Sequence, residues 1–311
     1  RPRARRPAGR IGRAERAPLG NWRLPAPPAP AAAMSGVSTP VALPRAYLFV
    51  PGDRPERFGK ARASGADAVI VDLEDAVAPV AKAHARDALA AALDESAPLV
   101  VRINAAGTPW FADDLELCRH PGVAAVMLPK AEGIDAVCEV VETTFKDVLP
   151  IIESARGIEA AGAIARVPGV VRLAFGSVDL ALDLGIDCEP DGREDELLYF
   201  RAQLVLASRL AGLAALADGV STAIDDIARL VADAERARRL GFGAKLCIHP
   251  KQVAPVQAAF APTATQVAWA SRVRDAFAAA AGAAVAVDGQ MIDRPLNERA
   301  LAILRSAGIS P

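Results

Sequence analysis

Two acidic residues, Glu153 and Asp179, each follow an apolar, strand-like run, Val148–Ile152 and Val171–Val178. An ionised carboxylate beside an apolar core must acquire a partner or a proton, because burial disfavours its charge. Two such groups on separate segments, in a chain with 3 histidines, favour an oxygen-ligand site for a hard divalent cation, and Mg²⁺ fits that chemistry best. The alternative is a structural one, in which the two carboxylates form buried ion pairs with Arg156 or Arg172.

Polar residues also follow the other apolar runs of the chain. From Arg45 onward, eight short β-prone runs alternate with longer segments rich in Ala, Leu, Arg and Glu, which is typical of repeated βα units. The runs are Ala46–Val50, Ala68–Leu73, Leu99–Ile103, Ala124–Leu128, Val148–Ile152, Val170–Phe175, Leu213–Ala217 and Ala244–Ile248. Their near-continuous hydrophobicity indicates parallel strands that are covered on both faces. Eight of them predict an α/β protein with a closed (β/α)8 TIM barrel.

In such a barrel the carboxyl ends of all strands meet at one rim, where active sites are built. The residues that follow the eight runs in order are Asp53 and Arg54, Glu74 and Asp75, Arg102 and Asn104, Lys130, Glu153, Asp179, Asp218, and His249. We therefore expect these side chains to collect around one mouth. A doubly wound sheet is the second architecture considered, but the phosphate-binding pattern G-x-G-x-x-G is missing after the first run.

Two helices between the runs are predicted with defined ends. The segment 79–93 is rich in Ala and has a proline at its start, and the segment 225–240 has apolar residues at helical spacing. Gly241 follows the second segment, where a glycine commonly ends a helix.

Composition limits the possible partners. The chain has a formal net charge of -1 from 36 basic and 37 acidic side chains, which gives no electrostatic reason to expect nucleic acid. No apolar stretch approaches the roughly 20 residues that cross a membrane. The 4 scattered cysteines show neither zinc spacing nor a disulfide framework, which indicates reduced thiols in a cytoplasmic protein. A small-molecule partner is expected.

The chain divides into three predicted parts. Residues 1–40 are rich in Arg, Ala and Pro and nearly lack acidic residues, so we expect a disordered extension. Because position 1 is not Met and Met34 precedes the folded pattern, this extension is interpreted as an artefact, with an organelle transit peptide as the alternative. Residues 41–262 are predicted to form the catalytic barrel, and residues 263–311 a C-terminal helical extension with a tail that acts in trans.

Seven stretches of the chain resemble the citrate lyase β-subunit-like branch of the HpcH/HpaI aldolase superfamily, which also contains malyl-CoA and citramalyl-CoA lyases. They span roughly residues 45 to 300 in the order found in the family. These stretches are Leu48–Phe58, Val71–Val77, Val101–Asn104, Met127–Lys130, Pro150–Gly157, Ala174–Leu180 and Cys247–Pro250. An eighth match, Met291–Pro295, corresponds to a C-terminal Met-Ile-Asp-x-Pro sequence of the members that cleave CoA esters.

The resemblance implies roles for particular residues. Glu153 and Asp179 are expected to bind Mg²⁺, and Arg102 to hold a substrate carboxylate. Asp293 is expected to enter a neighbouring subunit's site as a catalytic group, which implies a homo-oligomer, a trimer in the family. The coenzyme A arm is expected across the first βα loop, and its phosphates should meet three cationic side chains, namely Arg54, Arg57 and Lys60.

The reaction expected from this resemblance is a retro-Claisen cleavage of a short hydroxy-dicarboxylic acyl-CoA, such as malyl-CoA or citramalyl-CoA. Mg²⁺ would acidify the substrate hydroxyl, and Asp293 would act as the acid or base at the enolate carbon, or activate water in a thioesterase variant. Two other functions stay open. One is a β subunit of a citrate lyase complex that acts on a carrier-bound citryl thioester, and the other is a non-catalytic barrel that binds an acyl-CoA or keto acid.

Several polar residues have two interpretations. Glu74 and Asp75 either orient Lys130 or Arg102 and contact metal-bound water, or provide negative charge at a helix N-terminus. Lys130 also has the residue type of a Schiff-base aldolase lysine, although the acidic metal candidates speak against that chemistry. His249 is interpreted as a structural residue at a strand end, with proton donation as the alternative.

Overall fold

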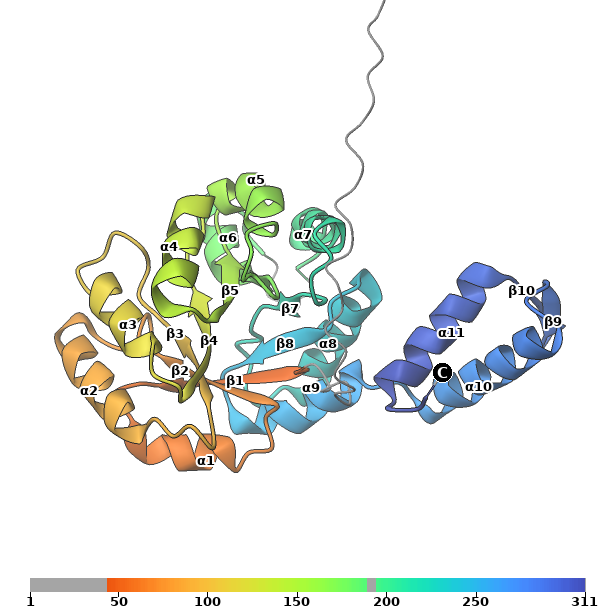
Figure 1. Ribbon diagram of the computed structural model, residues 1–311, viewed down its shortest axis with the longest axis horizontal. Helices are drawn as coiled ribbons and strands as arrows, with labels where there is room; N and C mark the ends of the chain where they lie inside the picture. The colour runs from red at the N-terminus through yellow and green to blue at the C-terminus, as the bar shows by residue number, and fades with distance from the viewer. Residues whose placement is uncertain (1–43, 189–193, 311) are drawn as a thin grey trace, which may run out of the picture. The chain divides into compact units, whose positions relative to one another are not determined.

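The computed structural model describes residues 44–188 and 194–310, so the predicted extension 1–40 lies outside the described residues. Eight parallel strands pair in sequence order and close into a barrel (Figure 1). The strands are β1 (Ala46–Pro51), β2 (Ala68–Asp72), β3 (Leu99–Arg102), β4 (Val123–Leu128), β5 (Asp147–Ile152), β6 (Ala174–Phe175), β7 (Ala217–Asp218) and β8 (Ala244–Cys247). This closure confirms the (β/α)8 prediction and excludes the doubly wound sheet.

Helices follow the strands and cover the outside of the barrel (Figure 1). They are α1 (Phe58–Arg62), α2 (Lys82–Ala92), α3 (Phe111–Cys118), α4 (Ile134–Thr144), α5 (Ala155–Ile164), α6 (Ser177–Leu184), α7 (Leu198–Leu210), α8 (Ile227–Leu240) and α9 (Val253–Phe260). Short 3-10 turns at Pro55–Arg57, Pro79–Ala81, Asp195–Leu197 and Pro250–Gln252 precede α1, α2, α7 and α9.

The two helices with predicted ends differ from the prediction at their N-termini. The segment 79–93 is divided into a 3-10 turn at Pro79–Ala81 and the helix α2. Helix α8 begins at Ile227 because Asp226 is its cap, with a side chain that accepts the backbone N–H of Arg229. Gly241 ends α8 as predicted, with a φ of 103° that is unfavourable for a side chain.

Strands β6 and β7 are shorter than the apolar runs that predicted them. Only two residues in each form the strand, whereas the runs 170–175 and 213–217 are longer. Some of the extra residues are buried, with Leu173 0% and Leu216 1% exposed. Others still bond to neighbouring strands, since the Val171 N–H donates to the Val148 carbonyl and the Ala214 N–H to the Val171 carbonyl, so the pairing in these runs is irregular and not absent.

The core has two layers, one inside the barrel and one between the strands and the helices. Side chains alternate between these layers along each strand, since successive residues of a strand point to opposite faces. Ile70 on β2 and Val100 on β3 lie in the inner cluster. Two residues further along, the same inner face carries Asp72 and Arg102 at the carboxyl ends of their strands. The alternation thus directs these two charged side chains into the mouth of the barrel.

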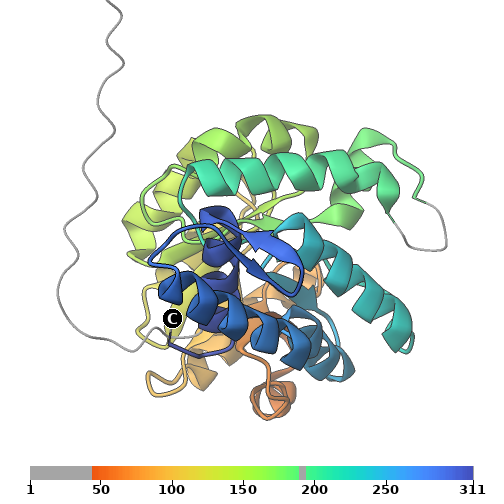
Figure 2. The ribbon, with the colours of Figure 1, turned by 90° about the vertical axis from the view of Figure 1, so that its right-hand side faces the viewer.

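The C-terminal extension forms a small unit with its own apolar cluster. It consists of α10 (Ala264–Ala279), an antiparallel pair of strands, β9 (Val285–Val287) and β10 (Gln290–Ile292), and α11 (Arg294–Ser306). Helices α10 and α11 pack side by side (Figures 1 and 2). The buried residues between these elements are Ala270, Val273, Val287, Ile292, Ala300 and Leu304. Among the residues that the structure describes, no helix has the length and hydrophobicity needed to cross a membrane.

Candidate active site

An ion pair between Asp72 and Arg102 forms one wall of the barrel mouth. The two residues are paired in register at the ends of β2 and β3. Arg102 donates from Nε to Asp72 Oδ1 at 2.7 Å and from Nη2 to Oδ2 at 2.6 Å, and its guanidinium lies 4.8 Å from the ring centre of Phe49. Burial disfavours the charge of Arg102, but the hydrogen bonds and charge of Asp72 outweigh burial and hold its pKa above the ordinary value. Asp72 therefore holds the Nε and Nη2 edge of the Arg102 guanidinium.

Asp72 is a site residue that the sequence reasoning missed. It is 1% exposed and also accepts the backbone N–H groups of Glu74 and Ala76. It was treated as part of an apolar run, although an acidic residue at the end of such a run was the signal used to select Glu153. The bidentate pair leaves only the Nη1 side of Arg102 for a second carboxylate, and Glu74 Oε2 lies 3.1 Å from Nη1.

Glu74 connects Arg102 to Lys130. It is 5% exposed, and Lys130 Nζ donates to its Oε1 at 2.6 Å. Burial raises the pKa of Glu74, while Arg102 and Lys130 act in the opposite direction. Asp75 is more exposed, with Oδ1 3.9 Å from Lys130 Nζ. Neither residue lies in the first turn of α2, so the interpretation of the pair as helix N-terminal charge is wrong.

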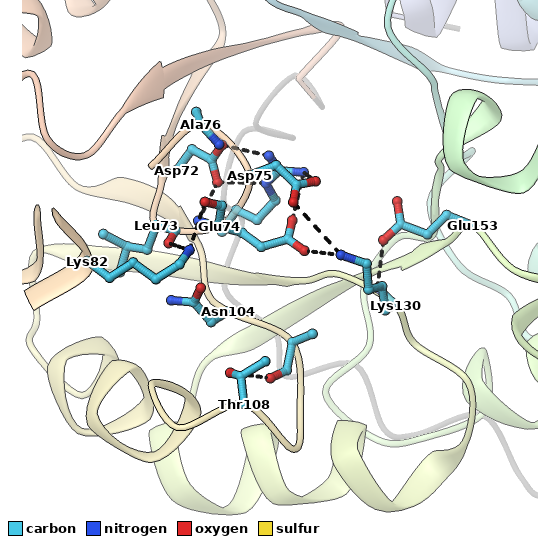
Figure 3. A network of polar contacts seen from close by, with 12 residues as sticks. Asp72, Leu73, Glu74, Asp75, Ala76, Lys82, Asn104, Thr108, Lys130 and Glu153 are labelled. Carbon is cyan, nitrogen blue, oxygen red and sulfur yellow. Dashed lines mark hydrogen bonds and ion pairs between the residues drawn. The ribbon is translucent and has the colours of Figure 1, made fainter. Parts of the chain in front are cut away.

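Lys130 bridges the two groups of carboxylates (Figure 3). Its ammonium contacts Glu74, and its backbone N–H donates to Glu153 Oε1 at 2.7 Å. The φ of Lys130 is 49°, a left-handed conformation that costs free energy for a residue with a side chain. This conformation points the backbone N–H of Lys130 toward β5 while its ammonium reaches the loop after β2.

Glu153, directly after β5, is buried without a cationic partner. It is 6% exposed, and the backbone N–H of Lys130 is its hydrogen-bond donor within the described part of the chain. Its pKa is raised to about 7, chiefly by burial. The charges of Asp179 and Glu74 act in the same direction, while the backbone hydrogen bond from Lys130 and the charge of Arg102 act against it. Gly176 makes room for this side chain, because a Cβ at position 176 would overlap Glu153 Oε2 and Cβ.

Asp179 lies in the first turn of α6, because β6 ends at Phe175. The charge of Asp179 is one of the causes of the raised pKa of Glu153, so the two carboxylates repel each other. The two arginines of the structural alternative have other partners. Arg156 Nη1 lies 3.9 Å from Glu132 Oε2, and Arg172 donates to the Pro44 carbonyl and the Tyr47 hydroxyl.

The donor set suits a hard cation that retains water or substrate oxygens. Within residues 44–188 and 194–310, no group of three or more His, Cys, Asp or Glu side chains is placed to hold an ion together. Glu153 and Asp179 would thus supply two carboxylates, as is common for Mg²⁺, which usually keeps several waters. A cation there would also supply the positive charge that buried Glu153 lacks.

The remaining predicted residues are more dispersed. Arg54, Arg57 and Lys60 are exposed, on the segment that follows β1 and in α1. Asn104 donates to Asp114, and His249 accepts the Lys251 N–H at the start of a 3-10 turn, which agrees with its structural interpretation.

Asp293 lies in the C-terminal extension as the N-cap of α11, where its Oδ1 accepts the Leu296 N–H at 3.2 Å. It has no hydrogen bond or ion pair with Glu153, Asp179 or Arg102 within the residues that the structure describes. The candidate site of one chain is thus assembled without it.

Comparison with known proteins gives a consistent family. Residues 45–250 match the family described as HpcH/HpaI aldolase/citrate lyase. A citrate lyase subunit beta-like protein of Deinococcus radiodurans is 40% identical over 86% of this chain and 99% of its own length. A (3S)-malyl-CoA thioesterase of Cereibacter sphaeroides is 36% identical over 80% of this chain and 89% of its own.

A solved structure shows the same relationship in three dimensions. The crystal structure of protein CitE from Mycobacterium tuberculosis, in complex with magnesium, acetoacetate and coenzyme A, superposes with a TM-score of 0.78. It is 40% identical in sequence, and the match covers 86% of this chain and 99% of that one. Sequence and fold therefore point to the same relatives.

Proposed function

The chain belongs to the HpcH/HpaI aldolase/citrate lyase family, and from this premise we propose that it is a Mg²⁺-dependent carbon–carbon lyase. Its substrate class is the CoA thioester of a short hydroxy dicarboxylic acid, such as malyl-CoA or citramalyl-CoA. The observation that carries the proposal is Glu153, a buried carboxylate with a pKa of about 7 that lies in the field of Asp179 and has no ion pair with a cation among the described residues. The magnesium and coenzyme A bound to the CitE relative support the same chemistry.

Each side chain at the mouth has a defined task in this proposal. Glu153 and Asp179 hold Mg²⁺, which supplies a Lewis acid that acidifies the substrate hydroxyl and stabilises negative charge on its oxygen. Arg102, whose Nε and Nη2 pair with Asp72 and whose Nη1 faces Glu74, is the cation assigned to the substrate carboxylate. Lys130 fixes the position of the Glu153 carboxylate, and Glu74 fixes the position of Nη1 of Arg102. Carbon–carbon cleavage then releases a thioester enolate and an α-keto acid.

Protonation of the enolate carbon requires an acid. We assign this role to Asp293 of a neighbouring copy, which implies a homo-oligomer, with a trimer as the expected form. The Met291–Pro295 sequence supports the assignment. The Asp293 side chain can give up its hydrogen bond to the Leu296 N–H for a contact in a neighbouring subunit, since that bond is an ordinary helix cap.

The proposal for Asp293 is tested by subunit complementation. Homo-oligomers of Asp293→Asn and of Glu153→Gln are each expected to be inactive, and co-expression of the two chains should restore a measurable fraction of activity. Recovery follows because some sites then combine an intact Glu153 with an intact Asp293. Activity that never recovers in verified mixed oligomers would contradict a role in trans.

Recognition of coenzyme A is proposed at the β1–α1 segment. Arg54, Arg57 and Lys60 are exposed cations there, and a phosphate-rich ligand gains from several such charges. Replacing Arg57 by Gln should raise KM for the acyl-CoA without changing kcat, because the phosphates are remote from the reacting carbon. A lowered kcat at unchanged KM would place this residue nearer the chemistry.

The function itself is tested with purified protein, Mg²⁺, and malyl-CoA and citramalyl-CoA, with the products read by mass. We expect acetyl-CoA with glyoxylate or pyruvate, and loss of turnover in EDTA with recovery on added Mg²⁺. Turnover that EDTA leaves intact would overturn the mechanism.

Two second candidates have specific support. Relatives named citrate lyase subunit beta-like favour a subunit that acts on a carrier-bound citryl thioester, which predicts no turnover of free CoA esters and co-purification with other chains. The relative named (3S)-malyl-CoA thioesterase favours hydrolysis, which predicts free malate and CoA in the same product assay. Binding of acyl-CoA without any product would instead indicate a non-catalytic barrel.

A further inference from the structure

Lys82 is a buried cation beneath the carboxylates of the site, and the roles given above do not use it. It is the first residue of α2 and is 6% exposed. Its Nζ donates to the carbonyl oxygens of Leu73 and Glu74, each at 2.9 Å (Figure 3). It also lies 5.0 Å from the ring centre of Trp110. A buried ammonium is costly, and here two carbonyl groups, an aromatic face and the nearby charges of Asp72 and Glu74 offset that cost.

The contacts of Lys82 hold the backbone of Glu74 from one side, while Asp72 holds it from the other. The Glu74 N–H donates to Asp72 Oδ1 at 2.9 Å, and the Glu74 carbonyl accepts from Lys82. With both backbone groups fixed, the Glu74 side chain leaves the loop in one direction. That direction brings Oε1 to Lys130 and Oε2 to Arg102. The Glu74 carbonyl also accepts the backbone N–H of Val77 at 3.0 Å, so Lys82 is the side-chain donor of two donors to this carbonyl.

We propose that Lys82 is a positioning residue of the active site, which orients Glu74 and, through it, the Arg102 guanidinium and the Lys130 ammonium. This inference rests on the proposed function for its kinetic consequences only, because the orientation of Glu74 is a structural quantity. Removal of Lys82 should weaken binding of the substrate carboxylate, because Glu74 contacts Arg102. It should leave Mg²⁺ binding unchanged, because Lys82 does not contact Glu153.

The test compares Lys82→Met, which keeps the chain length but removes the charge, with Lys245→Met as a matched control. Lys245 is also buried, at 2% exposed, and also donates to a loop carbonyl, that of Gly219, but it does not contact the carboxylate network of Glu74. We expect Lys82→Met to raise KM for the acyl-CoA about tenfold, with the half-saturating Mg²⁺ concentration within about twofold of wild type. The control should lower thermal stability and leave KM within about twofold.

Chemical rescue and crystallography complete the test. In Lys82→Ala, propylammonium should restore part of kcat/KM, which a merely destabilised protein would not show. A crystal structure of Lys82→Met should show Glu74 Oε1 farther from Lys130 Nζ than the present 2.6 Å, whether or not the wild type turns over any acyl-CoA. Unchanged Glu74 contacts in that structure, or an unchanged KM in an active enzyme, overturn the inference. An inactive wild type contradicts the proposed function alone.

Discussion

Glu153 and Asp218 are buried carboxylates at the carboxyl ends of β5 and β7 of the same barrel, yet they differ in the charges that surround them. Asp218, the last residue of β7, is 0% exposed and lies 3.2 Å from Lys245 Nζ and 3.0 Å from Arg201 Nε. Burial acts to raise its pKa, but the two cations outweigh burial and hold the pKa below its ordinary value. Glu153 has a backbone N–H as its donor, and its pKa is raised to about 7.

The difference separates a structural carboxylate from one prepared for a ligand. Around Asp218 the chain itself supplies the counter-charges, so the group is ionised and satisfied in the folded protein alone. Around Glu153 the chain supplies burial, the charge of Asp179 and only the more distant charge of Arg102, with no ion pair in the described residues. A charge that the fold leaves uncompensated is completed by something that binds, which here is the proposed Mg²⁺.

The largest effect is expected on activity when Glu153 is replaced. Glu153→Gln should lower kcat/KM by about 10³-fold, since an amide cannot provide a negative ligand for the cation. Without Mg²⁺ at pH 8, the same variant should be at least as stable as wild type, because it removes an uncompensated buried charge. Steady-state assays and thermal unfolding measure the two quantities. Glu159→Gln, an exposed position on α5, is the matched control and should change neither.

Asp218→Asn should have the reverse effects of Glu153→Gln, with lower stability and nearly unchanged activity. Loss of this carboxylate leaves Lys245 without its buried counter-charge and Arg201 with Glu194 as its remaining carboxylate partner, so we expect about 3 to 5 kcal/mol less free energy of unfolding. Denaturant unfolding measures the loss. The kcat/KM of the folded fraction should stay within about threefold of wild type. A stable Asp218→Asn protein with a large loss of activity would move Asp218 from the structural class to the catalytic one.

A third effect concerns the pH dependence of Mg²⁺ binding. The pKa of Glu153 rises from 4.5 to about 7 on folding, so between these values the metal-free folded protein holds a proton that the unfolded chain has lost. Its stability should therefore fall as pH increases through this window. Mg²⁺ binding displaces the proton, so affinity should rise about tenfold per pH unit up to about pH 7 and then level off. Calorimetry at several pH values checks this, and the slope should vanish in Glu153→Gln.

The smallest expected effect arises from Gly176. An added methyl group there would overlap the Glu153 carboxylate and displace it, so Gly176→Ala should weaken Mg²⁺ binding about tenfold. The control is Gly162→Ala in α5, where the added atom would meet the flexible end of Arg166 at 3.4 Å. Equal Mg²⁺ affinities in the two variants would show that Glu153 has more freedom than its burial suggests.

Much of the fold was predictable because burial leaves a regular signal in the sequence. Eight apolar runs predicted the eight strands, and most strand ends agree within one residue. The exceptions are β6 and β7, where the apolar runs pair irregularly and only two residues of each form a regular strand. Because β6 ends at Phe175, Asp179 lies in the first turn of α6 and not at the end of a strand, where the sequence predicts it.

The sequence predicted most residues of the site, but not which of them pair with one another. Strand-end positions identified Glu74, Arg102, Lys130 and Glu153, because all strands of a parallel barrel end at one rim. Asp72 was missed because it was read as part of an apolar run, and its pairing with Arg102 depends on the register between β2 and β3. Lys82 was missed because a lysine at the start of an exposed helix is ordinarily solvated, and only the folded loop buries it.

The sequence alone determined the barrel, the rim and the types of residue at the rim, because hydrophobic alternation and strand ends are local properties of the chain. Tertiary structure alone decided which charges neutralise one another. Electrostatic pairing depends on distances of a few ångströms between residues far apart in sequence, such as Lys130 and Glu74, 56 positions apart. The same distances give Asp218 two ion-paired cations and Glu153 no ion pair within the described chain, and that contrast marks the place where a metal ion is expected.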